Sequence, residues 1–177
     1  MKLIYAELLV GLLLIVSGIL LIFMTFSCEK NCKAFIRSNM ANWLVFGSAV
    51  SWFLWHITRL GEPDFGQYKW IFFGFFLTIA VIAFMSVRDF LCVRGLAVLV
   101  LLISNELLKA AYMCEQKSKL LMVSFLYLAI TTAIYLGIVP YRFRDFIDWL
   151  FKNDWLPKFV GLLSFLYGGV ILYFIKW

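Results

Sequence analysis

Six long apolar stretches, separated by short polar connections, dominate the pattern of this sequence. They cover residues 3–26, 41–58, 70–87, 90–112, 120–139 and 156–175. A helix needs about 20 mostly apolar residues to cross the hydrocarbon core of a bilayer. The pattern therefore predicts an all-α integral membrane protein: a single transmembrane domain over residues 1–177, built as a bundle of about six transmembrane helices.

The segment before the last stretch has a different, one-sided pattern. Apolar residues recur at positions i, i+3, i+4, i+7 and i+8 of one helical face, and charged residues occupy the opposite face. The apolar set is Phe143, Phe146, Ile147, Leu150 and Phe151, and the charged set is Arg144, Asp148 and Lys152. With Pro140 at its start, this pattern predicts an interfacial amphipathic helix over residues 141–153. The alternative, a helix packed on a soluble core, needs a core for which this sequence leaves no room.

Composition supports the assignment to a membrane. Of the 177 residues, 64% are hydrophobic and 15% are charged, whereas ordinary globular domains are roughly 45–50% apolar and about 25% charged. The net charge of +6 would suggest nucleic acid as the partner of a soluble protein. Here the basic residues lie mostly in short connections, where they orient the chain and meet anionic lipid. We therefore predict contact with membrane lipid and no binding of nucleic acid.

The distribution of basic residues predicts the orientation of the chain. Nine lysines and arginines belong to the first, third and fifth connections and seven to the opposite side, which favours both termini outside the cytoplasm. Five of the six arginines share the first side. These five are the candidates for contact with lipid or anionic headgroups: Arg37, Arg88, Arg94, Arg142 and Arg144.

Polar residues interrupt the fourth apolar stretch in the segment LLISNELLKAAY, which contains Asn105, Glu106 and Lys109. A charge near the middle of a span costs at least about 2.5–3.5 kcal/mol. We predict that Glu106 pairs with Lys109 at i+3, while Lys109 extends outward to the membrane surface. The alternative is a proton relay between Glu106 and His56, because the second and fourth stretches run in the same direction and end at the same face. Glu7, near the start of the first stretch, approaches that face as well.

The count of histidines excludes several kinds of site. His56 is the only one in the chain, so a single chain cannot build a bis-histidine haem site, a three-histidine metal site or a two-histidine zinc protease site. The sequence also lacks a phosphate-binding loop, a dinucleotide fingerprint and an EF-hand. We therefore predict no catalytic residue, no metal site and no cofactor, and we leave room for a bound lipid.

The four cysteines form no specific metal motif. Cys28 and Cys32 are spaced C-x3-C in the first connection, and they lack the second pair that would make such spacing specific. Cys92 and Cys114 stand at opposite ends of the fourth stretch, too far apart to join. We interpret the thiols as reduced and structural, with a Cys28–Cys32 disulfide as the alternative if that connection lies outside.

Small residues at i, i+4 predict where helices approach closely. Gly47 with Ser51, and Ser164 with Gly168, have the spacing that lets the backbones of two membrane helices come together. We interpret both pairs as packing sites.

The chain also resembles a family of small, uncharacterised polytopic membrane proteins of bacteria over roughly residues 50–150. The likeness rests on Asp89-Phe90-Leu91, Val93-Arg94-Gly95, the acid Glu106 and the start of the amphipathic helix, Pro140-Tyr141-x-x-Arg144-Asp145. The resemblance implies a multi-pass protein of the bacterial inner membrane. It implies no activity, substrate or cofactor.

Two functions remain from these observations. The first is a non-catalytic structural or accessory membrane protein that packs in a membrane complex or homo-oligomer. The alternative is a small transporter or proton-conducting protein that uses Glu106 with His56. A lipid-active enzyme ranks last, because no residue is evident for the step that breaks a bond.

Overall fold

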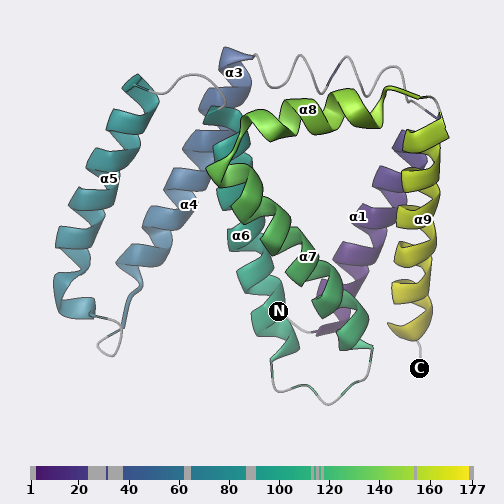
Figure 1. The fold of residues 1–177 in the computed structure, drawn as a ribbon. Coiled ribbons are helices and arrows are strands. Elements are labelled where there is room, and N and C mark those ends of the chain that lie inside the picture. Colours follow the sequence, from purple (N-terminus) through teal and green to yellow (C-terminus); the bar gives the residue numbers. More distant parts are fainter. Residues whose placement is uncertain are drawn as a thin grey trace.

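The fold, described here from a computed structural model, is made of helices. The structure describes residues 3–23, 31, 38–61, 65–86, 91–112, 114, 116, 118–153 and 155–175. Across these ranges the secondary structure consists of helices joined by short turns, and no strand is present (Figure 1). The predicted all-α class is therefore confirmed for the described residues.

Each predicted apolar stretch is helical where the structure describes it, except at Tyr112 and Val139, the last residues of their stretches. The elements are α1 (Leu3–Phe23), α3 (Asn39–Ala41), η1 (Asn42–Phe46), α4 (Gly47–Thr58), η3 (Gly66–Tyr68), α5 (Lys69–Ser86), α6 (Leu91–Ala111), α7 (Lys119–Ile138), α8 (Tyr141–Leu150) and α9 (Trp155–Ile175). Five helices are long and apolar enough to cross a membrane: α1, η3 continued by α5, α6, α7 and α9. Within the described residues, five helices are therefore candidates for membrane spans. The predicted number of six spans remains a proposal.

The predicted second span differs from the other five. Its three elements α3, η1 and α4 follow one another without a break, so residues 39–58 form one helical stretch. The middle element, η1, is a π-helix, a rare form whose backbone hydrogen bonds join residues i and i+5. The π-helical segment packs closely on α6: a Cβ added to Gly95 would stand 2.8 Å from the Cα of Phe46.

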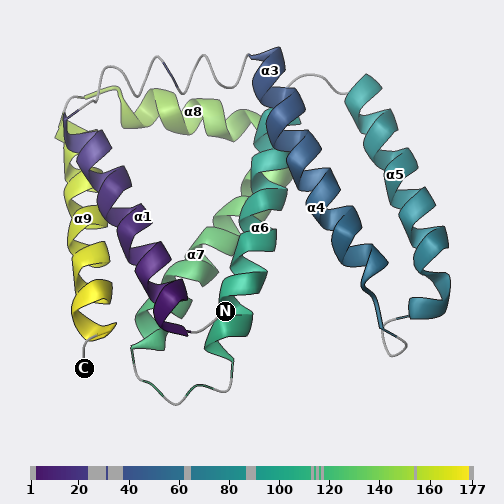
Figure 2. The same cartoon turned by 180° about the vertical axis from the view of Figure 1, so that it is seen from behind.

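The helices lie side by side in three pairs (Figures 1 and 2). Helix α4 lies beside α5, α6 packs on α7, and α1 runs antiparallel to α9. Helix α8 lies across one end of the molecule, between the end of α7 and the start of α9. The N and C labels lie toward the opposite end, where α1 begins and α9 finishes.

Glycines set the distance between α1 and α9. A Cβ added to Gly168 would stand 2.8 Å from the carbonyl oxygen of Gly11, so the two backbones are in direct contact there. The predicted close approach at Gly168 is therefore confirmed. The predicted close approach at Gly47 is not made within the chain, because a Cβ on Gly47 would meet nothing within 4 Å and the nearby Ser51 is exposed.

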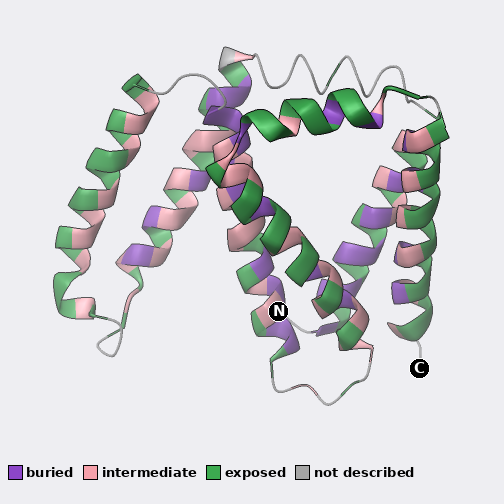
Figure 3. Cartoon of the chain, viewed as in Figure 1, coloured by how far each residue is buried: buried purple, intermediate pink, exposed green. Residues whose placement is uncertain are grey.

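The apolar core lies where four helices meet, toward the end that holds the termini. Its buried members are Leu3, Ala6, Val10 and Leu14 of α1, Leu107, Ala110 and Ala111 of α6, Met122 and Leu126 of α7, and Ile171 of α9. Figure 3 shows the buried residues concentrated on these helices and on α4, whereas α5 has none. Much of the remaining apolar surface is exposed, as expected for helices that face lipid.

The predicted amphipathic helix is present as α8. Pro140 occupies the N-cap position with φ −67°, which is the backbone angle that proline already holds. Ile147 and Leu150 of its apolar face are buried, while Phe146 is exposed. The helix ends at Leu150, three residues before the predicted end, and residues 151–153 form a turn and bends.

Candidate functional site

The polar residues predicted on the second and fourth stretches come together at the C-terminal ends of α4 and α6. Lys109 Nζ donates a hydrogen bond of 3.0 Å to Glu106 Oε1, and this confirms the predicted i+3 pair. His56 Nε2 lies 3.6 Å from the same oxygen of Glu106. The two helices therefore end at the same face, as their parallel direction predicts. One carboxylate oxygen thus faces both an amine and an imidazole.

This cluster of Glu106, His56 and Lys109, which we call the α4–α6 polar cluster, lies at the surface of the chain. The side chains of Lys109, Glu106 and His56 are 58%, 42% and 32% exposed. A separation of 3.6 Å is too long for a hydrogen bond, and no donor or acceptor in the described residues bonds to the buried atom His56 Nε2. The Glu106–His56 contact is therefore electrostatic proximity, and the Glu106–Lys109 contact is the bonded one.

Two tryptophans of α4, Trp52 and Trp55, lie near the histidine end of the cluster. The His56 ring stacks on Trp52, with ring centroids 6.4 Å apart and an interplanar angle of 18°. One turn further along α4, the Arg59 guanidinium lies 4.5 Å from the centre of the Trp55 ring, a cation–π contact. Tryptophan with a cation at a helix end is typical of the boundary between lipid and water.

Two cavities between the helices are separate from the polar cluster. One, of about 330 Å³, lies between α6 and α7 and is lined by residues that include Val100, Leu128 and Thr132. A second, of about 230 Å³, lies between α4, α5 and α6 against Phe53, Phe76 and Val98. Neither lining includes a charged residue. These cavities fit apolar groups, and neither connects Glu106 to water.

The remaining predicted residues do not join the cluster. Asn105 is exposed on α6. Arg94 is half-buried near the opposite end of the same helix, and Arg142 and Arg144 are exposed on α8. The predicted headgroup candidates Arg37 and Arg88, and also Cys28 and Cys32, lie outside the described residues.

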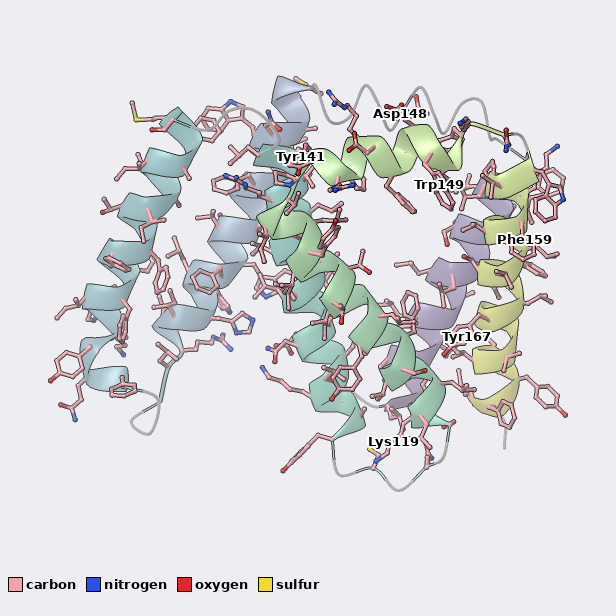
Figure 4. The ribbon with its side chains drawn as sticks, in the orientation of Figure 1. Lys119, Tyr141, Asp148, Trp149, Phe159 and Tyr167 are labelled. Atoms are coloured by element: carbon pink, nitrogen blue, oxygen red, sulfur yellow. The ribbon has the colours of Figure 1, made fainter. Side chains whose placement is uncertain are left out.

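Local contacts hold the two arginines of α8. The Arg142 guanidinium lies 5.8 Å from the ring centre of Tyr141, and Arg144 Nη2 lies 3.8 Å from Asp145 Oδ1. Figure 4 labels Tyr141, Asp148 and Trp149 on this helix. Helix α8, which carries both arginines, lies at the end of the molecule opposite the C-terminal ends of α4 and α6 (Figure 1).

The two cysteines that the structure describes are unpaired. Cys92 is buried near the start of α6 and Cys114 is half-buried beyond its end. The prediction that these two cannot join is confirmed.

Glu7 is buried, which the sequence pattern did not predict. This residue of α1 is 1% exposed, and its Oε1 atom is buried without a hydrogen-bond donor from any described residue. The signal was available, because Glu7 is the only acidic residue in the first apolar stretch. The pattern alone did not say whether this carboxyl faces lipid, water or other helices.

A metal centre finds little support in these side chains. Within the part of the chain that the structure describes, no group of three or more His, Cys, Asp or Glu residues could hold a metal ion.

Comparisons with protein-family models, with curated proteins and with solved structures found no match for this chain.

Proposed function

We propose that the chain is a multi-pass membrane protein without catalysis of its own, which acts by packing against other membrane helices in a complex or homo-oligomer. One observation carries the proposal: α5 has no buried residue and touches the rest of the molecule mainly through α4. Its sides are apolar and include Trp70, Ile71 and Phe75 among the exposed residues. A long apolar helix on the outside of a small bundle is available for a partner helix within the bilayer.

The proposal includes six spans, with residues 39–58 as the sixth. The helices then alternate in direction, α8 lies along one membrane surface, and both termini share the opposite side. Exposed Arg142 and Arg144 on α8 support placing that helix among anionic headgroups. The resemblance to bacterial membrane proteins and the weak excess of basic residues favour the inner membrane, with both termini outside the cytoplasm.

Purification in a gentle detergent from native membranes, followed by mass spectrometry of co-migrating proteins, tests the proposal. We expect stoichiometric partners or a homo-oligomer. A matched pair of variants sharpens the result: Gly74→Leu on α5 and Gly169→Leu on α9 both add a side chain where nothing lies within 4 Å. Loss of association in Gly74→Leu, with association kept in Gly169→Leu, supports α5 as the contact. A chain that migrates alone as a monomer overturns the proposal.

A second candidate function is proton conduction through the α4–α6 polar cluster. The observation in its favour is the 3.6 Å separation of His56 Nε2 and Glu106 Oε1, since both groups exchange protons. Proton flux into liposomes that contain the purified protein tests it. We expect flux in the native chain and its loss in Glu106→Gln. Absence of flux in the native chain, or unchanged flux in the variant, removes this candidate.

A further inference from the structure

The apolar cavity between α6 and α7 is used by neither proposed function. Its volume is about 330 Å³, and its lining follows one face of α7 from Phe125 to Leu136. Ala97 of α6 and Ala133 of α7 are buried in its floor, so their short side chains leave the space. Leu128 in the lining is 69% exposed. The cavity is therefore a groove that opens on the outside of the helix pair, which we call the α6–α7 groove.

The length of the α6–α7 groove matches the depth of one lipid leaflet. From Phe125 to Leu136, α7 rises by about 16 Å at 1.5 Å per residue. The hydrocarbon core of a bilayer is about 30 Å thick, so one leaflet contributes about 15 Å. Leu136 belongs to the last turn of α7, which ends at Ile138. The groove therefore starts near the end of the molecule where α8 lies and stops near the middle of α7.

The lining of the groove suits a hydrocarbon chain. Thr132 supplies the one polar side chain among the described lining residues. Its hydroxyl donates a hydrogen bond of 2.8 Å to the carbonyl oxygen of Leu128 in the same helix. A polar ligand in the groove would leave its own hydrogen bonds unmade, and this costs free energy. A hydrocarbon chain has no such bonds to lose.

Basic groups stand at the α8 end of the groove. The end of α7, the start of α6 and the start of α8 lie at this same end of the molecule (Figures 1 and 2). The Arg142 backbone N–H donates a hydrogen bond of 3.2 Å to the carbonyl oxygen of Val139, directly after α7. The exposed Arg142 guanidinium contacts the face of the Tyr141 ring, which uses none of its N–H donors. On α6, half-buried Arg94 follows the lining residue Val93.

A phospholipid combines these two requirements in the same order, with hydrocarbon next to a phosphate. A guanidinium binds phosphate oxygens through charge-assisted hydrogen bonds. An apolar helix of another chain would cover the groove without a countercharge for the arginine at its end. Free phosphate would leave the groove itself empty. The length of the groove and the charge at its end therefore favour a lipid with a net negative headgroup.

We propose that the α6–α7 groove binds one acyl chain of an anionic phospholipid from the leaflet beside α8, and that Arg142 binds the phosphate of this lipid. The inference rests on the proposed placement of α8 along a membrane surface. It needs neither a partner protein nor proton flux.

Photochemical crosslinking in lipid vesicles tests the proposal. The full chain is reconstituted in phosphatidylcholine with a trace of phosphatidylglycerol that carries a diazirine in one acyl chain, and mass spectrometry locates the label. We expect more label at Val100 and Leu128 in the groove than at Ile71 and Phe75, which are exposed on α5. Replacing part of the phosphatidylcholine with unlabelled phosphatidylglycerol should remove the label from the groove and leave that on α5. Label spread evenly over the exposed helices, or unaffected by the replacement, overturns the proposal.

A matched pair of variants tests the place of the acyl chain. Thr131 and Thr132 are adjacent, exposed threonines of α7, and each donates its hydroxyl to a carbonyl oxygen of its own helix. Only Thr132 is in the described lining of the groove. Thr132→Phe should lower the label in the groove several-fold, and Thr131→Phe should keep it. Equal labelling in the two variants overturns the proposal.

A second pair tests the place of the phosphate. Arg142→Gln should weaken the competition by unlabelled phosphatidylglycerol about fivefold, the change expected for one basic residue at an anionic surface. Arg144→Gln removes the same charge from the same helix, and Arg144 lies 3.8 Å from Asp145. It should change the competition much less. Equal effects would mean diffuse attraction to the surface, and would overturn the assignment of the phosphate to Arg142.

Flotation of the chain with the vesicles separates the possible failures. A chain that does not float contradicts the proposed placement in a membrane as well as the lipid site. A chain that floats but crosslinks to a second copy of itself in the groove, in place of lipid, overturns the lipid site alone.

Discussion

Gly18 of α1 and Gly161 of α9 bring their backbones into direct contact. A Cβ on Gly18 would stand 2.6 Å from the carbonyl oxygen of Gly161, and a Cβ on Gly161 would stand 2.9 Å from that of Gly18. Two turns away, Gly11 and Gly168 repeat the contact in the antiparallel sense. Membrane helices that lack a hydrophobic driving force between them gain attraction from such close backbone packing.

Two adjacent glycines of α9, Gly168 and Gly169, provide a test of this packing and its control. Gly168 has the Gly11 carbonyl oxygen against its Cβ position, whereas Gly169 has nothing within 4 Å. We expect Gly168→Ala to lower the free energy of unfolding by about 1–3 kcal/mol, because the added methyl group forces the helices apart. Gly169→Ala should leave it unchanged or raise it slightly, since alanine favours a helix over glycine. Unfolding in mixed detergent micelles measures both. Equal effects at the two positions would contradict the packing.

Tyr167 joins α9 to α7 through a hydrogen bond to the carbonyl oxygen of Leu121. The phenylalanine variant keeps the ring and removes the hydroxyl. Tyr167→Phe should therefore lower the free energy of unfolding by about 0.5–1.5 kcal/mol. Tyr173, which is exposed on the same helix, provides the control. Tyr173→Phe should change stability by less than about 0.5 kcal/mol, and a Tyr167→Phe effect no larger than that would argue against the bond.

Asn42 of the π-helical segment supports the start of α6. Its Oδ1 accepts a hydrogen bond of 3.0 Å from the Cys92 backbone N–H, which belongs to the first turn of α6 and has no partner within the helix. We expect Asn42→Ala to cost about 1–2 kcal/mol of unfolding free energy. Asn105→Ala, at an exposed site on α6, serves as the matched control and should be close to neutral. Hydrogen exchange of the Cys92 amide should also accelerate in Asn42→Ala alone.

The Glu106–Lys109 pair should contribute little to stability despite its short distance. Both side chains are substantially exposed, and exposed ion pairs typically contribute about 0.2–1 kcal/mol. A double-mutant cycle with Glu106→Gln and Lys109→Gln measures the coupling energy. A value well above 1 kcal/mol would mean that the pair is shielded from water in the membrane, and would revise the surface position assigned to it.

The helices were predictable from sequence because each is a long apolar run. The predicted last stretch, 156–175, differs by one residue from the observed helix Trp155–Ile175. The placement of His56 and Glu106 at the same end of the molecule was predictable as well, because only one long helix, α5, stands between α4 and α6, so that α4 and α6 run in the same direction. Similarly, Pro140 and the one-sided pattern after it predicted the start of α8 correctly.

The contacts between helices were not predictable in the same way. The i, i+4 spacing of small residues is equally present at Gly47 and at Gly168, yet only Gly168 faces a neighbouring backbone. Which face of α1 is buried depends on α9, at the other end of the chain, and a local pattern does not contain that information. Glu7 illustrates the same limit, since its place in the first apolar stretch does not show that its side chain is buried.

The contact between α1 and α9 also has a consequence for the order in which the protein assembles. A ribosome completes α1 long before it reaches Trp155, so the glycine-lined face of α1 is made without the helix that covers it. Until α9 follows, lipid, a temporary helix neighbour or the insertion machinery has to cover that face and Glu7 beside it. Synthesis of α9 therefore completes the packing of a helix that was made well before it.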